Sequence, residues 1–315
     1  MKTKIKVSFI GAGPTSEEHI KVFSTFNQIS LTGIMSRTSS KAKTLAEKYN
    51  LRVFDSIESL FDGTKSDLVV ITVPIIQTYP VCMEAFNYPW KLLIEKPVGY
   101  NFEQSKSIAE AAKSLGRKAF VALNRRQYSS TKKVLEMLED DSTRRVINVY
   151  DQEDTISAAK LGHSDLVIEN WMYANSIHLI DFFKIFGRGE IESVTPIVDF
   201  DKDIKKNNFV AKKISFSSGD IGLYQCYWNM PAPWSVTLTT SKNRWEMKPL
   251  ENVSVQHYPS RVVNHIQTNK YDIDFKPGFY NQAIEAIKAS KDEDHNLLNL
   301  EDSLDTMKLI QQLYE

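Results

Sequence analysis

The stretch "FIGAGPTSEEHI", residues 9–20, decides which fold is expected for this chain. It places Gly11, Gly13 and Ser16 at the spacing G-x-G-x-x-G/A, between an apolar strand-like run and a helix-like run. Gly11 permits the tight turn, and Gly13 lets a pyrophosphate approach the free N–H groups at the start of the helix. Pro14 suits a first helical turn, because its missing N–H costs little there. The alternative is a plain tight turn that binds nothing.

Residues 4–124 alternate short apolar runs with amphipathic stretches, which is typical of strands followed by helices. The strand-like runs are 4–13, 29–37, 51–54, 67–74, 90–97 and 118–124. The helix-like stretches are 16–26, 39–50, 56–63, 78–88 and 102–116. Because the strands are apolar on both faces, they predict a parallel sheet covered by helices on both sides. Right-handed crossovers then make it a doubly wound sheet of an α/β fold.

The pattern changes after about residue 123, where strand-like segments separated by turns replace the regular alternation. These segments are 144–154, 191–200, 208–219, 221–230, 234–242 and 243–258, and helices are expected at 130–141, 175–187, 278–290 and 299–315. Asn299 or Asp302 is expected to cap the last helix. The sequence predicts a first domain, residues 1–122, and a second α/β domain, residues 123–315, with an open, largely antiparallel sheet. The last helices are candidates for packing back on the first domain.

The composition is that of a globular protein without a charge bias. Apolar residues make up 42% and charged residues 25%, and Lys+Arg and Asp+Glu both number 39. This balance gives no attraction to nucleic acid or anionic lipid, and the longest apolar run, 68–76, is far below the roughly 18 residues of a membrane span. Cys82 and Cys226 have no ligand or redox spacing, which suits a reducing cytoplasm. The histidines are too scattered to predict a metal site.

The end of the second strand, "MSRTSSKA" (residues 35–42), bears on which dinucleotide binds. An acidic residue here would bind the ribose 2′-hydroxyl of NAD, whereas an arginine would accommodate the 2′-phosphate of NADP. The chain has no carboxylate here. Arg37 can bind a phosphate through two N–H groups, and Lys41 adds charge. Ser36 and Thr38 can donate further hydrogen bonds. We therefore expect NADP(H) in preference to NAD(H); alternatively, Arg37 is a surface arginine and either cofactor binds.

A lysine stands at the end of the fifth strand, in "LLIEKP" (residues 92–97). Ligands of doubly wound sheets bind beyond the carboxyl ends of the strands, so Lys96 is expected to face the nicotinamide end of the cofactor. There it is placed to exchange a proton with a substrate hydroxyl or to hydrogen-bond it. Glu95 is expected to pair with Lys96 or with a helix terminus. The residues predicted to contact the cofactor are Gly11, Gly13, Pro14, Thr15, Ser36, Arg37, Thr38, Lys41, Val73, Pro74, Glu95 and Lys96.

Several stretches together resemble the glucose–fructose oxidoreductase, inositol dehydrogenase and MocA (Gfo/Idh/MocA) family. They are "GAGPTSEEH" (11–19), "SRTSSKAKTLAEKY" (36–49), "EKPVG" (95–99), "LNRRQYSSTKKVLEML" (123–138) and "HLIDFFKIFG" (178–187). The resemblance implies a Rossmann domain, a second α/β domain often used for oligomerisation, and a Lys–Pro peptide that is usually cis. It also implies oxidation or reduction of a sugar, cyclitol or similar polyol with NAD(P). In that setting Lys96 contacts the reacting hydroxyl, and His178 serves as acid/base.

The chain departs from the family pattern at two places. The family commonly has Asp four residues before the histidine and Gly two before, where this chain has Ala174 and Ser176. A carboxylate one helical turn from His178 would raise its basicity, which Ala174 cannot do. After the fourth strand the family often has Asn and, three residues later, His, where Ile75 and Thr78 stand here. The wall on the cofactor side is therefore expected to be more apolar than usual.

Substrate contacts are expected on both sides of the predicted cleft. Asn124 and Arg126 come at the end of the sixth strand, and Trp171 and Asn175 precede the histidine. The alternatives are structural. In one, the polar residues after the sixth strand pair with carboxylates at the domain junction. In the others, Trp171 is a residue of the hydrophobic core, and His178 is a structural histidine whose ring nitrogens bond to protein groups.

These features predict an NADP(H)-dependent oxidoreductase that transfers a hydride between nicotinamide and a carbohydrate-like alcohol or ketone, such as a sugar, cyclitol or nucleotide sugar. Its expected partners are a small-molecule substrate and further copies of itself, as a homo-dimer or homo-tetramer, and not nucleic acid or membrane. Two alternatives stay open. One is a non-catalytic cofactor-binding regulator of the same fold, and the other is a hydrolase or epimerase that uses the bound cofactor.

Overall fold

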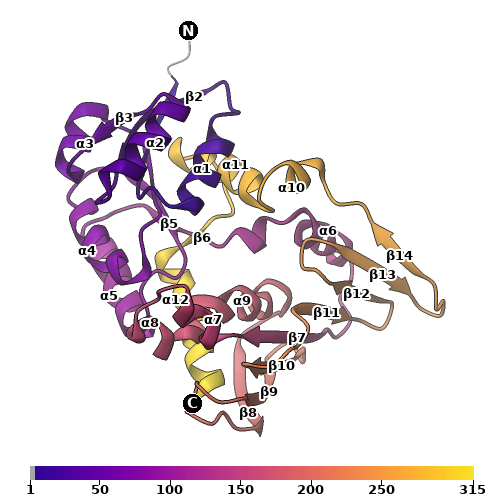
Figure 1. The fold of residues 1–315 in the computed structure, drawn as a ribbon. Helices are drawn as coiled ribbons and strands as arrows, with labels where there is room; N and C mark the ends of the chain where they lie inside the picture. Colours follow the sequence, from indigo (N-terminus) through magenta and orange to yellow (C-terminus); the bar gives the residue numbers. More distant parts are fainter. Residues whose placement is uncertain (1–3) are drawn as a thin grey trace. The chain divides into compact units, whose positions relative to one another are not determined.

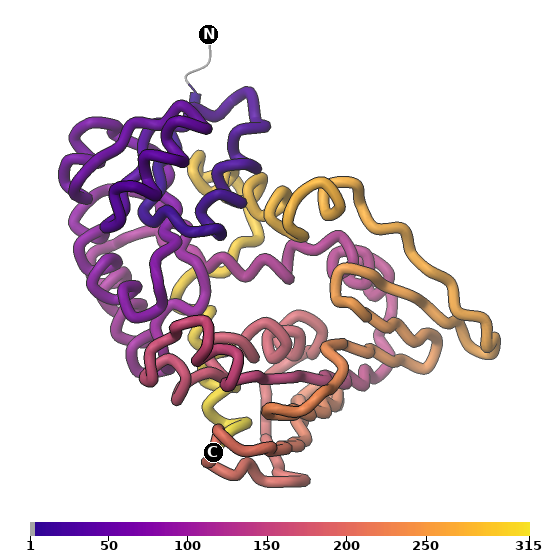
Figure 2. The backbone as a smooth tube through the Cα atoms, viewed as in Figure 1, coloured from indigo at the N-terminus to yellow at the C-terminus, as the bar shows by residue number. Residues whose placement is uncertain are grey.

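The computed structural model describes residues 4–315 and divides into two compact units (Figure 1). Unit 1 comprises Met1–Asn124 and Asp274–Leu304, and unit 2 comprises Arg125–Ile273 and Asp305–Glu315. The chain therefore enters unit 1 twice, and the backbone trace in Figure 2 shows the later segment, in yellow, returning to the indigo and purple N-terminal segment. The functions of the two predicted domains stay a prediction.

Unit 1 is built on a sheet that has seven strands within the described part of the chain. The strands are β1 (Ile5–Ile10), β2 (Ile29–Met35), β3 (Arg52–Phe54), β4 (Leu68–Ile71), β5 (Lys91–Glu95), β6 (Ala119–Ala122) and β15 (Leu298–Asn299). They lie in the order β15-β6-β5-β4-β1-β2-β3, and β1–β6 pair in parallel while β15 runs antiparallel to β6. Because the strand order reverses at β1, the predicted Rossmann-type doubly wound sheet is confirmed.

Helices cover both faces of this sheet. They are α1 (Pro14–Phe23), α2 (Ser39–Tyr49), α3 (Ile57–Thr64), α4 (Ile75–Ala85), α5 (Phe102–Ser114) and α11 (Phe279–Ser290). Figure 1 shows α3, α4 and α5 on one side of the strands and α1 and α11 on the other. On the second side, Val7, Phe9 and Val70 of the strands pack in one core with Phe23 of α1 and Ala286 of α11. Burial of both faces explains why β4 and β6 consist of apolar residues alone.

Local signals in the sequence set the ends of several helices. Pro14 lies in the first turn of α1, as predicted. Ser56 accepts a hydrogen bond from the backbone N–H of Ser59 and forms a capping box at the start of α3. The last helix, α12 (Leu300–Tyr314), is capped by Asn299, whose side-chain oxygen accepts from the backbone N–H of Asp302 at 2.8 Å. Of the two caps that the sequence offered, the structure uses Asn299.

Unit 2 contains a sheet of eight strands within the described residues, in the order β14-β13-β12-β11-β7-β10-β9-β8. The strands are β7 (Val146–Glu153), β8 (Ile191–Val198), β9 (Asn208–Phe216), β10 (Ile221–Trp228), β11 (Ser235–Thr239), β12 (Asn243–Met247), β13 (Val253–His257) and β14 (Val263–Ile266). Only β7 and β10 are parallel neighbours in this described part of the chain; the other pairs are antiparallel. The predicted open, largely antiparallel sheet is confirmed.

Short helices and one longer helix accompany this sheet. Helices wholly or partly in unit 2 are α6 (Ser129–Leu138), α7 (Thr155–Lys160), α8 (Asp165–Glu169), α9 (Ile177–Phe186), α10 (Lys270–Asp274) and α12. α9 packs against β7 and is buried along most of its length. A π-helical turn, Met172–Ser176, leads directly into it.

Several predicted boundaries differ from those observed. α4 begins at Ile75 and not at residue 78, because Pro74 supplies an extended residue just before the helix. β6 ends at Ala122, so the residues predicted to end that strand instead form a 3₁₀ turn, Asn124–Gln127. The helix predicted at 175–187 begins with the π turn. The sequence did not indicate α7, α8, α10, β14 or β15, since each is too short to show a hydrophobic period.

Residues 4–315 contain neither a long apolar helix nor a cluster of metal-ligating side chains. No helix there is long and apolar enough to cross a membrane, and no group of three or more His, Cys, Asp or Glu side chains is arranged to hold a metal ion. Cys82 and Cys226 are buried. Burial raises the pKa of the Cys82 thiol to about 12 and that of Cys226 well above its ordinary value. Both are therefore uncharged thiols near neutral pH.

Candidate functional site

The glycine loop after β1 has a backbone shape that excludes a side chain at its first glycine. Gly11 has a φ of +113°, and a Cβ there would lie 2.3 Å from the carbonyl oxygen of Thr72. The Gly11 N–H donates to the carbonyl oxygen of Met35, and its own carbonyl accepts from the Ser16 hydroxyl, both at 2.8 Å. Ser16 is fully buried. The loop is therefore held by contacts with Met35 at the end of β2, with Thr72 just after β4, and with the buried Ser16 of α1.

The second glycine leaves space that an anion can fill. Gly13 caps α1, and among residues 4–315 no atom lies within 4 Å of the place a Cβ would take. The first N–H groups of α1 have no acceptor in the helix, so they are available to a phosphate. Glu17 in the same turn would repel a phosphate, but Lys48 binds its carboxylate at 2.6 Å, and this hydrogen bond lowers the pKa of Glu17. Pro14 is exposed and Thr15 half-buried. The loop fits the diphosphate of a dinucleotide.

The chain beyond β2 presents cationic and hydroxyl groups beside this loop. The last register pair of β1 and β2 places Ser36 and the residues after it next to Gly11. Arg37, Thr38 and Lys41 are all exposed. Within the described residues, neither the Arg37 guanidinium nor the Lys41 ammonium has a hydrogen bond or ion pair to another protein group. Both cations are thus available to a phosphate at the end of β2.

The tip of β5 contains a carboxylate bonded to a buried histidine. Glu95 Oε1 lies 2.8 Å from Nε2 of His19, which is 2% exposed and whose ring centroid lies 4.5 Å from that of Phe279. The sequence prediction did not name His19 as the partner of Glu95, because residues 76 positions apart show no local signal. Lys96 follows, half-buried, and the Lys96–Pro97 peptide is cis, as the resemblance implies.

The predicted cofactor residues all lie near the carboxyl ends of the parallel strands in unit 1. Val73, half-buried, and Pro74, exposed, follow β4, just as Gly11, Ser36 and Lys96 follow β1, β2 and β5. Because these strands are parallel, all these positions lie beyond their carboxyl ends. Contact of each residue with a cofactor stays a prediction.

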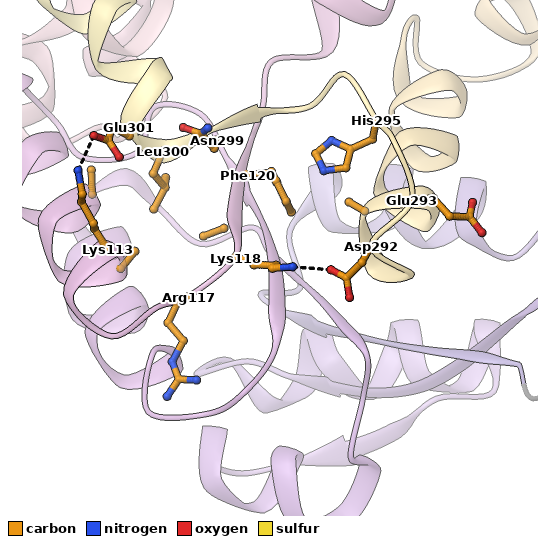
Figure 3. A pocket seen from close by; sticks show the side chains of 14 residues that line it. Lys113, Arg117, Lys118, Phe120, Asp292, Glu293, His295, Asn299, Leu300 and Glu301 are labelled. Atoms are coloured by element: carbon orange, nitrogen blue, oxygen red, sulfur yellow. Dashed lines mark hydrogen bonds and ion pairs between the residues drawn. The ribbon is translucent and has the colours of Figure 1, made fainter.

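A cavity of about 490 Å³ lies at the opposite edge of the same sheet. Its lining includes Lys113 and Lys118 before β6, Asp292 before β15 and Glu301 after β15, and Figure 3 shows two ion pairs there, Lys113–Glu301 at 2.7 Å and Lys118–Asp292 at 2.6 Å. Glu301 lies at the amino end of β6 because β15 is antiparallel to β6, and Asp292 lies there because it binds Lys118, the residue before β6. This cavity is therefore not the site indicated by the glycine loop.

In unit 2, His178 lies beside Trp234, whose ring also contacts Arg125. His178 is 8% exposed, and its ring is perpendicular to that of Trp234, with centroids 6.3 Å apart. The guanidinium carbon of Arg125 lies over the Trp234 ring at 4.8 Å. The sequence prediction did not place Trp234 or Arg125 beside the histidine. Trp234, which directly precedes β11, and Arg125, in the 3₁₀ turn, both lie far from α9 in the sequence.

Arg126 forms a bidentate ion pair that competes with its predicted role. Its Nε and Nη2 both donate to the Asp181 carboxylate at 2.7 Å, and the Thr306 hydroxyl donates to the same group at 2.8 Å. Asp181 is 1% exposed. This geometry favours the alternative in which the arginine pairs with a carboxylate, and it shows that Asp181 anchors neighbouring segments of unit 2.

The other predicted substrate residues also have protein contacts. Asn124 donates to the carbonyl oxygen of Pro277 at 3.0 Å within unit 1, and Asn175 donates to Glu153 at 3.0 Å within unit 2. Trp171 packs its ring at 5.1 Å from that of His163, and its indole N–H is buried with no acceptor among residues 4–315. Substrate contact by these side chains stays a prediction.

A buried acidic pair on β7 is the main feature that the sequence prediction missed. Asp151 and Glu153 are both fully buried. A signal was present in the sequence, since Ile147, Val149, Asp151 and Glu153 occupy alternate positions and must share one face of the strand. Lys96 belongs to unit 1 and His178 to unit 2, so their meeting beside one substrate stays a prediction.

Comparison with known sequences identifies the N-terminal part of the chain. A family model described as an oxidoreductase family with an NAD-binding Rossmann fold matches residues 5–123. The D-glucoside 3-dehydrogenase of Escherichia coli (strain K12) is 29% identical over 115 residues, which are 36% of this chain and 33% of that protein. The chain thus matches about a third of the length of this curated relative.

Solved structures share the fold along the whole chain. A dehydrogenase from Chromobacterium violaceum has a TM-score of 0.83 at 18% identity, covering 99% of this chain and 95% of its own. UDP-N-acetylglucosamine 3-dehydrogenase from Acidithiobacillus ferrooxidans has a TM-score of 0.79 at 14% identity, covering 98% and 96%. At such identities the likeness shows the fold alone. The resemblance seen in the sequence is confirmed by the family match over residues 5–123, which are similar to the NAD-binding Rossmann domain of the Gfo/Idh/MocA oxidoreductases.

Proposed function

We propose that this protein is an NADP(H)-dependent oxidoreductase that transfers a hydride between nicotinamide and a carbohydrate-like alcohol or ketone. The proposal depends on the arrangement of the residues that follow the carboxyl ends of β1 and β2. There, a glycine turn closed to side chains is followed by an open helix N-terminus and by two cations without protein partners among the described residues. An anionic dinucleotide with an extra phosphate satisfies each of these features.

Different residues of unit 1 bind different parts of the cofactor. The backbone N–H groups after Gly13 bind the diphosphate, and the missing side chain at Gly13 lets it approach. Arg37 and Lys41 bind the 2′-phosphate, for which Arg37 offers two parallel N–H donors. The bound nicotinamide supplies a carbon that accepts or donates a hydride.

Two side chains act on the reacting hydroxyl group of the substrate. The Lys96 ammonium, just beyond β5, hydrogen-bonds the substrate oxygen and stabilises the charge that develops on it. His178 takes or gives the proton. A carbohydrate-like substrate is supported by the names of two similar proteins, a D-glucoside 3-dehydrogenase and a UDP-N-acetylglucosamine 3-dehydrogenase.

A direct test combines binding with turnover. NADPH and NADH are titrated by fluorescence, and then sugars, cyclitols and nucleotide sugars are screened with each cofactor for a change in reduced-nicotinamide absorbance. We expect NADPH binding and turnover of at least one compound class. Binding without turnover of any compound would favour a cofactor-binding regulator, and product formation with no net absorbance change would favour a hydrolase or epimerase.

The cofactor preference is tested by Arg37→Ala. Hydrogen bonds to a charged group contribute about 1.5–3 kcal/mol, so NADPH affinity should fall about 10- to 100-fold while NADH affinity stays within about twofold. Lys43→Ala is the matched control, because Lys43 is an exposed cation on the same helix, α2. It changes the net charge equally and should leave both affinities unchanged. Equal losses for NADPH and NADH in the Arg37 variant would contradict the 2′-phosphate assignment.

A further inference from the structure

Two carboxylates lie buried on one face of β7. Asp151 and Glu153 continue the buried face that begins with Ile147 and Val149, and both are fully buried. α9, the helix that contains His178, packs against this strand. Burying a carboxylate costs free energy unless it accepts hydrogen bonds. The groups that donate to Asp151 and Glu153 are therefore the groups whose positions these two carboxylates determine.

Glu153 holds the turn that leads into α9. Its Oε1 accepts from the Ser176 hydroxyl at 2.6 Å, and its Oε2 accepts from the side-chain amide of Asn175 at 3.0 Å. Both donors belong to the π turn Met172–Ser176, which ends two residues before His178. π turns are rare and are frequently found at functional sites. Glu153 thus fixes the backbone from which the imidazole projects.

Asp151 holds the indole that stands beside the imidazole. Its Oδ1 accepts from the indole N–H of Trp234 at 2.6 Å, and its Oδ2 accepts from the Tyr224 hydroxyl at 2.9 Å. The Trp234 ring is the one that lies perpendicular to the His178 ring. Burial raises the pKa of the Asp151 carboxyl, which is the direction expected for a carboxyl removed from water. The orientation of the indole, and with it the space left for the imidazole, depends on Asp151.

Two tyrosine hydroxyls join these anchors into one network. The hydroxyls of Tyr224 and Tyr314 lie 2.7 Å apart, and the Tyr314 hydroxyl lies 3.3 Å from that of Ser176. The chain of contacts therefore runs from Asp151 through both tyrosines and Ser176 to Glu153, entirely within unit 2. A buried network in which each group has its partners makes the surrounding structure rigid.

We propose that Asp151 and Glu153 are positioning residues that fix the His178 imidazole, one through the Trp234 indole beside it and the other through the π turn before it. The proposal rests on the proposed function, in which His178 exchanges a proton with the substrate. A group that transfers a proton must be held within a fraction of an ångström of its working position, and a misplacement of about 1 Å can cost 100-fold in rate. Neither carboxylate needs to touch the substrate to have such an effect.

The first test is a cycle of two substitutions. Glu153→Gln keeps the size of the side chain but replaces one acceptor oxygen with an NH₂ group that faces a donor. We expect kcat to fall about 10- to 100-fold with NADPH affinity unchanged. Ser176→Ala should lower kcat in the same way, and the double variant should be no worse than Glu153→Gln alone, because both act through one contact. Additive losses would overturn the proposed route through Ser176.

Asp220→Asn provides the matched control for a merely structural effect. Asp220 is a buried carboxylate of the same unit, 1% exposed and bound by Arg188 at 2.7 and 2.9 Å, but it lies beside the amino end of β7. Its loss should lower Tm at least as much as Glu153→Gln does, while kcat stays within about twofold. A kcat loss in Asp220→Asn equal to that in Glu153→Gln would overturn the proposal.

A spectroscopic measurement separates this proposal from the proposed function. The chain has six histidines, so ¹³C-histidine NMR spectra are simple, and the His178 signal is the one missing in His178→Gln. In Glu153→Gln, and also in Asp151→Asn, the His178 signal should shift or broaden while the other five stay in place. An unmoved His178 signal would refute the positioning role. A moved signal in a protein that turns over no substrate would leave the positioning role standing and refute the proposed activity.

Discussion

Lys96→Met is expected to lower kcat by about 10²- to 10⁴-fold while NADPH affinity stays within about threefold. A positioned donor that stabilises the charge on a reacting oxygen typically contributes a factor of this size, and methionine keeps the length of the side chain but has no proton to donate. The position supports a role at the reacting atoms, because Lys96 follows directly on β5 at the edge that also bears Gly11 and Arg37. Steady-state kinetics on the substrate found in the screen, with NADPH titration of the same preparations, measure both quantities.

Lys91→Met is the matched control for this substitution. Lys91 starts the same strand at its other end, where its ammonium binds Asp292 and the carbonyl oxygen of Ser290, each at 2.8 Å. Its removal costs an ion pair whose acidic partner is about half exposed, so a small loss of stability and an unchanged kcat are expected. An unchanged kcat in Lys96→Met would instead show that this lysine takes no part in the reaction.

Substitutions at the two loop glycines should have opposite consequences. Gly11→Ala forces a Cβ against the Thr72 backbone and onto a φ of +113°, so we expect a loss of about 3 kcal/mol or more in unfolding free energy. Gly13→Ala meets open space at a φ of −86°, so stability should stay within about 1 kcal/mol. NADPH affinity, however, should fall at least about 10-fold, because the new methyl group takes the space of the diphosphate. Thermal unfolding and NADPH titration test the pair.

Gly116→Ala separates the two causes of strain at Gly11. Gly116 has a φ of +62°, and no atom among residues 4–315 lies within 4 Å of its Cβ position. The substitution therefore adds left-handed strain without a clash, and a loss of about 1–2 kcal/mol is expected. If Gly11→Ala costs no more than Gly116→Ala, the contact with Thr72 is not what excludes a side chain. If Gly13→Ala binds NADPH normally, the diphosphate does not approach there.

Much of unit 1 was predictable, because its signals are local. The strands are rich in apolar residues because both faces of a parallel sheet are buried, and the glycine spacing lies where β1 is followed by α1. Pro14 and Asn299 act at helix starts through atoms only a few residues away. Such features depend on the chain's own backbone geometry, so they can be recognised before any tertiary contact is known.

The contacts of unit 2 were less predictable, because they join distant positions. The sequence marked Arg126 as a substrate contact, yet its guanidinium binds Asp181, 55 residues away. It marked Ala174 as a lost carboxylate, yet Glu153 brings a carboxylate from β7 to the two residues that follow Ala174. Short elements such as α7 and β14 have no hydrophobic period of their own, so packing alone determines them.

By itself the sequence determined the alternation of strands and helices from β1 to β6, the glycine turn and the presence of a lysine at a strand end. These follow from hydrophobic period and from the conformations open to glycine and proline, both of which are properties of neighbouring residues. Only the tertiary structure decided that Glu95 binds His19, that Arg126 binds Asp181, and that Asp151 and Glu153 lie beneath the His178 helix. Those pairings depend on which helices pack on which strands. A buried charged group needs a hydrogen-bonding partner, and tertiary packing determines which groups lie close enough to be that partner.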